Sequence, residues 1–308
     1  MKVAFMGNPS FALPPLEKLI HSSHEIIAII SNPPKPMGRK RILNHTDVGK
    51  FALKKNIELI ELDSFDDNEV YKKIVSLDAD IFVVVAYRIL PEKYISIPKL
   101  GSINLHASLL PKYRGAAPIQ WALMNGDQTT GVSVFQIEKK VDTGKILVQK
   151  TIEIDKNDNY EIMSKKLSII GAEALIESLD YLEKGNVNYI EQDNSAVTRA
   201  PKISKNMLRI KWDWPAEKIN NWISGLSPKP GMITTFQNKT IKIFKSVIVD
   251  VHSKNKPGKI KFENKNSLKI YTGKGLLSIL ELQQEGKKYL PVDQFLRGVN
   301  IDEWDLFS

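Results

Sequence analysis

The stretch INLHASLLPKYRGAAPIQWALMNGDQTTGVSVFQIEKKVDTG, residues 103–144, holds most of the side chains in this sequence that are suited to catalysis. Asn104 and His106 lie two positions apart at the end of an apolar run, and residues i and i+2 of a strand project from the same face. Asp142 begins the turn Asp142-Thr143-Gly144 after an alternating segment. An amide, an imidazole and a carboxylate can together stabilise an oxyanion and move a proton. We therefore treat Asn104, His106 and Asp142 as a candidate catalytic set.

Each of the three residues also has a plainer interpretation. A single histidine in an apolar segment is usually a core residue with its hydrogen bonds satisfied, and an asparagine at a strand end often bonds to the backbone. An aspartate before Thr-Gly is commonly a turn residue. The residue pattern alone leaves both interpretations open, because it does not show that Asp142 lies near the other two side chains.

The segments before this stretch predict an α/β domain with a mostly parallel, Rossmann-like sheet. Apolar strands are expected at residues 2–6, 26–30, 81–86 and 102–106, with helical segments between them. Ligands of such sheets bind beyond the carboxyl ends of the strands, so the last two strands should line one crevice. No GxGxxG motif follows the first strand, and a dinucleotide site is therefore not supported.

The C-terminal part of the chain has a different pattern. A long helix is expected from residue 160 to 183, with Asn159 as its N-cap. Beyond it, short strands separated by turn residues predict a small OB-like β-barrel. We therefore predict a catalytic domain at 1–188, a linker at 189–207 and a basic β-barrel domain at 208–308.

Composition narrows the possible chemistry. The chain has 308 residues, 42% of them hydrophobic, and contains no cysteine, which excludes disulfides and thiolate nucleophiles. Its five histidines show no HxxxH or HExxH spacing, so we expect no metal. No apolar run approaches membrane-spanning length, and the apolar start breaks at Asn8-Pro9. We accordingly expect a cytoplasmic protein, free of the membrane, and a monomer.

Positive charge is concentrated in two places. The formal net charge is +9, and residues 205–308 contain 18 Lys and Arg against 10 Asp and Glu, which gives +8 for that part alone. Arg39, Lys40 and Arg41 form a basic tip in residues 31–43, where three prolines and a glycine predict an irregular loop. Both features suit contact with a polyanion, although a solvated basic surface would have the same composition.

The quoted motif resembles that of the folate-dependent formyltransferases. The resemblance also covers MGNPSFALPPLEKL (6–19), PPKPMGRKRIL (33–43), VVVAY (83–87) and RIKWDWPAEKINNWISGLSPKPG (209–231), and so extends nearly from end to end. It implies transfer of a formyl group from 10-formyltetrahydrofolate to the amino group of methionine on initiator tRNA. The family's strand pair corresponds to Asn104 and His106, and its essential carboxylate to Asp142.

The resemblance also assigns binding residues. It implies that the donor site is lined by Ser108, Leu109, Leu110 and Pro111. The arginine that enters the acceptor end of the tRNA corresponds to Arg39, and Lys40 and Arg41 would add phosphate contacts. One departure from the family concerns Arg88, which stands directly before Ile89-Leu90-Pro91 and leaves the segment one residue short.

Two other functions fit part of the pattern. An amino-sugar-nucleotide formyltransferase would use the same donor and the same Asn, His and Asp residues, but residues 115–119 and the basic segment are closer to the tRNA-modifying members. A non-catalytic RNA-binding module would explain the charge and leave the three polar residues incidental. Affinity for formyl-folate would distinguish this last possibility from the other two.

Overall fold

The computed structural model describes residues 1–38, 41–261, 266–300 and 305–308. The chain divides into two compact units. Unit 1 comprises residues 1–115, 129–152 and 164–200, and unit 2 comprises residues 116–128, 153–163 and 201–308. Each unit has its own sheet, and the two sheets differ in strand direction.

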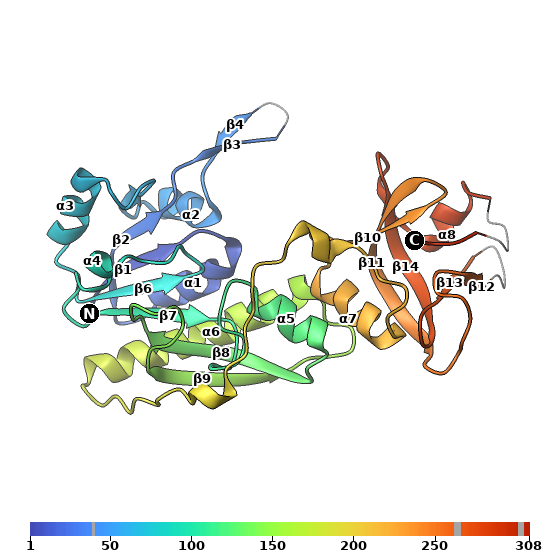
Figure 1. Ribbon diagram of the computed structural model, residues 1–308. Coiled ribbons are helices and arrows are strands. Elements are labelled where there is room, and N and C mark those ends of the chain that lie inside the picture. The colour runs from blue at the N-terminus through green and yellow to red at the C-terminus, as the bar shows by residue number, and fades with distance from the viewer. Residues whose placement is uncertain (39–40, 262–265, 301–304) are drawn as a thin grey trace. The chain divides into compact units, whose positions relative to one another are not determined.

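Unit 1 is built on a seven-stranded sheet with the order β5-β2-β1-β6-β7-β8-β9 (Figure 1). The first five strands in this order pair in parallel, and β8 runs antiparallel to β7. The predicted mostly parallel sheet is thus confirmed. Its strands are β1 (Lys2–Gly7), β2 (Glu25–Ser31), β5 (Leu59–Glu61), β6 (Ile81–Val85), β7 (Ser102–His106), β8 (Thr129–Gln136) and β9 (Ile146–Glu153).

Side-chain caps begin several of the helices. The Thr46 hydroxyl accepts from the Gly49 amide at 2.9 Å, and the Asn159 side chain accepts from the Ile162 amide at 3.0 Å, as the sequence predicted. No helix in the described residues is both long enough and apolar enough to cross a membrane. Up to residue 183 the helices, apart from one described below with unit 2, are η1 (Ser10–Ala12), α1 (Leu13–Ile20), α2 (Asp47–Lys55), α3 (Asn68–Ser76), α4 (Glu92–Ile95) and α6 (Tyr160–Glu183).

The basic segment between β2 and α2 is more regular than its composition predicted. β3 (Lys35–Met37) and β4 (Ile42–Asn44) pair antiparallel, with Pro36 opposite Leu43, and Figure 1 shows them as a separate two-stranded ribbon. The prediction of an irregular loop was wrong. Each strand of a two-stranded ribbon has one edge that pairs with no other strand, and a proline whose missing N–H would face that edge costs no hydrogen bond between strands. Arg39 and Lys40 lie outside the described residues, whereas Arg41 is exposed.

Unit 2 contains the second sheet and its apolar core. Five strands follow the order β10-β11-β14-β13-β12, and β15 pairs with β14. The described strand pairs are antiparallel and form a half-barrel, which confirms a small β-domain of the predicted class. Its elements are α5 (Pro118–Asn125), η3 (Lys205–Leu208), α7 (Ala216–Gly225), β10 (Met232–Phe236), β11 (Lys239–Asp250), β12 (Ile260–Lys261), β13 (Leu268–Tyr271), β14 (Leu276–Gln284), β15 (Tyr289–Pro291) and α8 (Val292–Leu296).

Replacing Gly131 of β8 should destabilise unit 1. A Cβ atom at this position would lie 2.2 Å from the Lys150 carbonyl oxygen of β9 and 2.5 Å from Leu109 Cδ2. We expect Gly131→Ala to lower the free energy of unfolding by about 1–3 kcal/mol, because the backbone of β9 would have to move. Urea unfolding followed by circular dichroism measures this change.

The control for this substitution is Thr129→Ala. Thr129 is exposed on the same strand, and its replacement should change the free energy of unfolding by less than about 0.5 kcal/mol. Equal unfolding midpoints for the Gly131 variant and the wild-type chain would show that the close approach of β9 is not required.

Candidate functional site

Asn104 and His106 share one face of the central strand β7. Asn104 lies in register between Val84 of β6 and Phe135 of β8, and His106 pairs with Ser133 of β8. The intervening Leu105 lies on the opposite face, where a Cβ atom on Gly171 of α6 would be 2.8 Å from its Cδ2 atom. The structure therefore places the amide and the imidazole on the face of the sheet that α6 does not cover.

The His106 side chain is fixed by a backbone carbonyl. Its Nε2 atom lies 2.9 Å from the Tyr113 carbonyl oxygen, and the residue is only 7% exposed. A carbonyl can only accept, so Nε2 must carry the hydrogen of this bond. The other nitrogen, Nδ1, is then the atom that can take up and release a proton.

Asp142 is held by the same loop as His106. Its Oδ2 atom accepts a hydrogen bond from the Gly115 amide at 2.8 Å. Among the described residues, His106 and Asp142 share no hydrogen bond or ion pair, and the Tyr113 carbonyl orients the ring. The two side chains are connected through the backbone of residues 113–115.

The segment 108–111 turns back against β8. The buried Ser133 hydroxyl accepts from the Leu110 amide at 3.0 Å and donates to the Ser108 carbonyl at 2.7 Å. The Ser108 hydroxyl donates to the Lys112 carbonyl at 2.6 Å. Ser108 and Leu110 are buried, whereas Leu109 and Pro111 are half-buried. Any ligand contact from this segment must therefore come from its backbone or from Leu109 and Pro111.

Arg88 fixes the segment that follows β6. Its guanidinium donates to the carbonyls of Leu62 and Asp63, each at 2.6 Å, and stacks 4.4 Å from the ring centre of Phe65. It also donates to the Tyr87 hydroxyl at 3.0 Å. Burial raises the pKa of Tyr87, although this hydrogen bond acts in the opposite direction. Arg88 thus anchors the end of β6 to the segment that follows β5.

Sequence reasoning missed several residues that build this site. Ser133 supports segment 108–111. Gln192 and Thr198 bond to the loop 113–115, and Arg114 of that loop is the partner of Gln192. Arg114 lies inside the quoted motif and could have been noticed there. Gln192 and Thr198 lie in the predicted linker, and nothing in their local sequence marks them.

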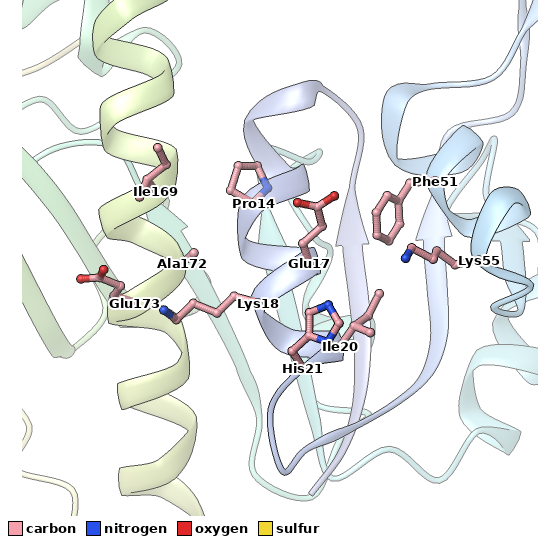
Figure 2. Close-up of a pocket in the computed structure, with 10 residues that line it drawn as sticks. All are labelled: Pro14, Glu17, Lys18, Ile20, His21, Phe51, Lys55, Ile169, Ala172 and Glu173. Atoms are coloured by element: carbon pink, nitrogen blue, oxygen red, sulfur yellow. The ribbon is translucent and has the colours of Figure 1, made fainter.

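Two other features of unit 1 lie away from these residues. His24, Asp180 and Glu183 have ligand atoms within 4.8 Å of one another, but the Met1 ammonium group already lies 2.8 Å from Glu183 Oε1. The cavity in Figure 2 contains none of the predicted site residues. It is lined by residues of α1, α2 and α6, with His21 following α1: Pro14, Glu17, Lys18, Ile20, His21, Phe51, Lys55, Ile169, Ala172 and Glu173.

Curated relatives match this chain over nearly its whole length. Three of them, all named methionyl-tRNA formyltransferase, come from Thermodesulfovibrio yellowstonii (42% identical, covering 99% of each chain), Enterococcus faecalis (39%, covering 99% of this chain and 98% of the relative) and Caldanaerobacter subterraneus subsp. tengcongensis (38%, covering 98% of each).

Solved structures with the same fold are more distant in sequence. The sugar 3N-formyl transferase WlaRD is 21% identical, with a TM-score of 0.69 and coverage of 94% of this chain and 99% of that chain. HypX from Aquifex aeolicus, solved in complex with tetrahydrofolic acid, is 17% identical, with a TM-score of 0.66. The match covers 98% of this chain and 48% of HypX. At this identity the likeness concerns the fold alone.

Family models account for both parts of the sequence. The model described as "Formyl transferase" matches residues 1–179, and "Formyl transferase, C-terminal domain" matches residues 202–300. These matches confirm the family resemblance inferred from the sequence motifs. The chain belongs to the formyl transferase family.

Proposed function

We propose that this chain transfers the formyl group of 10-formyltetrahydrofolate to the amino group of methionine on initiator tRNA. The observation that carries the proposal is identity of 38% to 42% along almost the full length to relatives named for this reaction. The geometry at the end of β7 supports it, because Asn104 and His106 share one face of β7, and the loop 113–115 bonds both to His106 and to the Asp142 carboxylate.

The site residues supply what this reaction requires. The methionine amine attacks the formyl carbon, a tetrahedral oxyanion forms, and the bond from that carbon to the folate nitrogen breaks. The side-chain amide of Asn104 can donate a hydrogen bond to the oxyanion. His106 Nδ1 can take a proton from the attacking amine and return it to the leaving nitrogen, because Nε2 is held by Tyr113.

We assign Asp142 to the same catalytic set. Its carboxylate fixes the Gly115 amide, and through residues 113–115 it stabilises the loop that orients His106. The formyl group passes between two nitrogens, so the atoms balance without a metal ion or a covalent enzyme intermediate.

We assign donor binding to Ser108, Leu109, Leu110 and Pro111, as the family resemblance implies. Leu109 and Pro111 are the half-buried members of this segment. The Ser108 and Leu110 side chains contribute by holding the backbone, since the first bonds to Lys112 and the second packs against Phe135 and Ile146.

We assign acceptor binding to the basic regions of the chain. Arg39, Lys40 and Arg41 follow β3 and precede β4 in the sequence, and the +8 charge of residues 205–308 suits a phosphate backbone. This assignment keeps the domain boundaries 1–188, 189–207 and 208–308, with the last domain binding tRNA. We further propose a cytoplasmic monomer.

A formyl-transfer assay with two acceptors tests the proposal. Charged initiator methionyl-tRNA and an amino-sugar nucleotide would be offered separately with 10-formyltetrahydrofolate. We expect transfer to the tRNA only. Transfer to the sugar nucleotide only would retain the donor chemistry and refute the acceptor, and absence of transfer to both would refute the proposed function.

Replacing His106 should remove most of the activity. We expect His106→Ala to lower kcat by about 10²–10⁴-fold, because the variant lacks the group that transfers the proton. Steady-state kinetics with methionyl-tRNA measures the change, and circular dichroism checks the fold. The control His21→Ala removes an exposed histidine beside the cavity of Figure 2 and should leave kcat unchanged.

Replacing the basic residues between β3 and β4 in the sequence should weaken use of the tRNA. We expect Arg39→Ala and Arg41→Ala each to raise KM for methionyl-tRNA, leave KM for the donor unchanged, and reduce the salt dependence of tRNA binding by about one phosphate contact. The control is Lys72→Ala on α3, where the lysine is exposed and paired with Glu69. Unchanged tRNA kinetics at all salt concentrations would contradict the assignment.

A further inference from the structure

Residues 190–200, which follow α6 and look like a linker in the sequence, pack along the candidate site. Ile190 and Ile146 exchange two backbone hydrogen bonds of 2.9 Å each. The Tyr113 amide donates to the Thr198 hydroxyl at 2.8 Å. The Arg114 amide donates to the Thr198 carbonyl at 3.0 Å. The loop that holds His106 and Asp142 is thus held in turn by residues 190–200.

The loop 113–115 and residues 190–200 approach each other closely. The Ala200 amide donates to the Arg114 carbonyl at 2.8 Å. A Cβ atom on Gly115 would lie only 2.6 Å from the Ala200 carbonyl oxygen, and Gly115 has a φ of +127°, which other residues rarely adopt. The loop can therefore occupy this position only because residue 115 is glycine.

Gln192 makes the most extensive side-chain contacts of the 190–200 segment. Its Oε1 atom accepts from Arg114 Nε at 3.0 Å and from a terminal guanidinium nitrogen of Arg114 at 2.7 Å. Its Nε2 atom donates to the Asp142 carbonyl at 3.0 Å and to the Gly144 carbonyl at 2.7 Å. Gln192 as a whole residue is 9% exposed, so these four hydrogen bonds are largely shielded from water.

This set of partners requires an amide. The guanidinium group of Arg114 can only donate, so the side chain at position 192 must offer it an acceptor. The carbonyls of Asp142 and Gly144 can only accept, so the same side chain must offer them two hydrogens. Only the side-chain amide of glutamine or asparagine offers both, and glutamine is the longer of the two. The partners also fix the orientation of the amide without ambiguity.

We infer that Gln192 is a positioning residue that holds the Asp142 turn and the Arg114 loop in the arrangement the reaction needs. Its Nε2 atom fixes the backbone of the turn that carries Asp142, whose carboxylate bonds to Gly115. Its Oε1 atom fixes Arg114, which lies between Tyr113 and Gly115. The inference rests on the proposed function for its catalytic consequence.

Two substitutions of Gln192 in the full chain separate these contacts. Gln192→Leu removes all four hydrogen bonds at similar volume. Gln192→Glu keeps an acceptor for Arg114 but places a carboxylate oxygen against the carbonyls of Asp142 and Gly144. The matched control is Glu191→Gln, because Glu191 is the neighbouring residue and makes an ion pair at the surface with Lys145.

Kinetics and amide exchange measure the effect together. We expect both Gln192 variants to lower kcat about 10–100-fold, because small displacements of catalytic groups slow the reaction strongly, with KM for donor and tRNA changed little. Hydrogen–deuterium exchange of the peptide containing Gly115 should be faster in both variants, since its bond to Asp142 is loosened. Glu191→Gln should match the wild-type chain in every measurement.

The outcomes distinguish this inference from the proposed function. If the wild-type chain transfers formyl groups and a folded Gln192 variant keeps its kcat, the inference is overturned. The same conclusion follows if kcat/KM falls only through a higher KM while kcat is unchanged, or if Gly115 exchange is unchanged. If the wild-type chain transfers no formyl group to either acceptor, the proposed function fails, and the exchange measurement alone then decides whether Gln192 positions the loop.

Discussion

The candidate site depends on two peptide groups of one short loop. The Tyr113 carbonyl accepts from His106 Nε2, and the Gly115 amide donates to the Asp142 carboxylate, at 2.9 and 2.8 Å. Peptide groups do not titrate near neutral pH, and their positions are set by the backbone. Two ionisable side chains from separate elements are therefore kept in fixed orientations while one nitrogen of His106 remains available for proton transfer.

The sheet explains why these groups meet at this place. β7 lies between a parallel neighbour, β6, and an antiparallel neighbour, β8. The parallel side leaves strand ends open toward ligands, as in other α/β sheets. The antiparallel side brings Ser133 beside the residue that ends β7, and its hydroxyl then secures the backbone of residues 108–110. A mixed sheet thus combines an open edge with a firmly held loop.

Local patterns in the sequence predicted the strands, the shared face of Asn104 and His106 and the cap of α6, because each depends on residues close together in the chain. The contacts of Asp142 and Gln192 could not be predicted, since each depends on a residue 27 or more positions away. The β3–β4 ribbon was missed for another reason: proline content was weighted above the free edges of a two-stranded ribbon.

The candidate site is built from two segments that lie far apart in the sequence. Residues 103–144 supply the groups suited to the chemistry, whereas residues 190–200 reach the same loop only after the 24-residue helix α6. Such a helix spans about 36 Å, so the chain crosses the domain before it returns to the site. Substitutions in residues 190–200 can then change the positions of the candidate catalytic groups while those groups themselves stay the same. The geometry of the candidate site therefore depends on residues that lie outside the motif at 103–144.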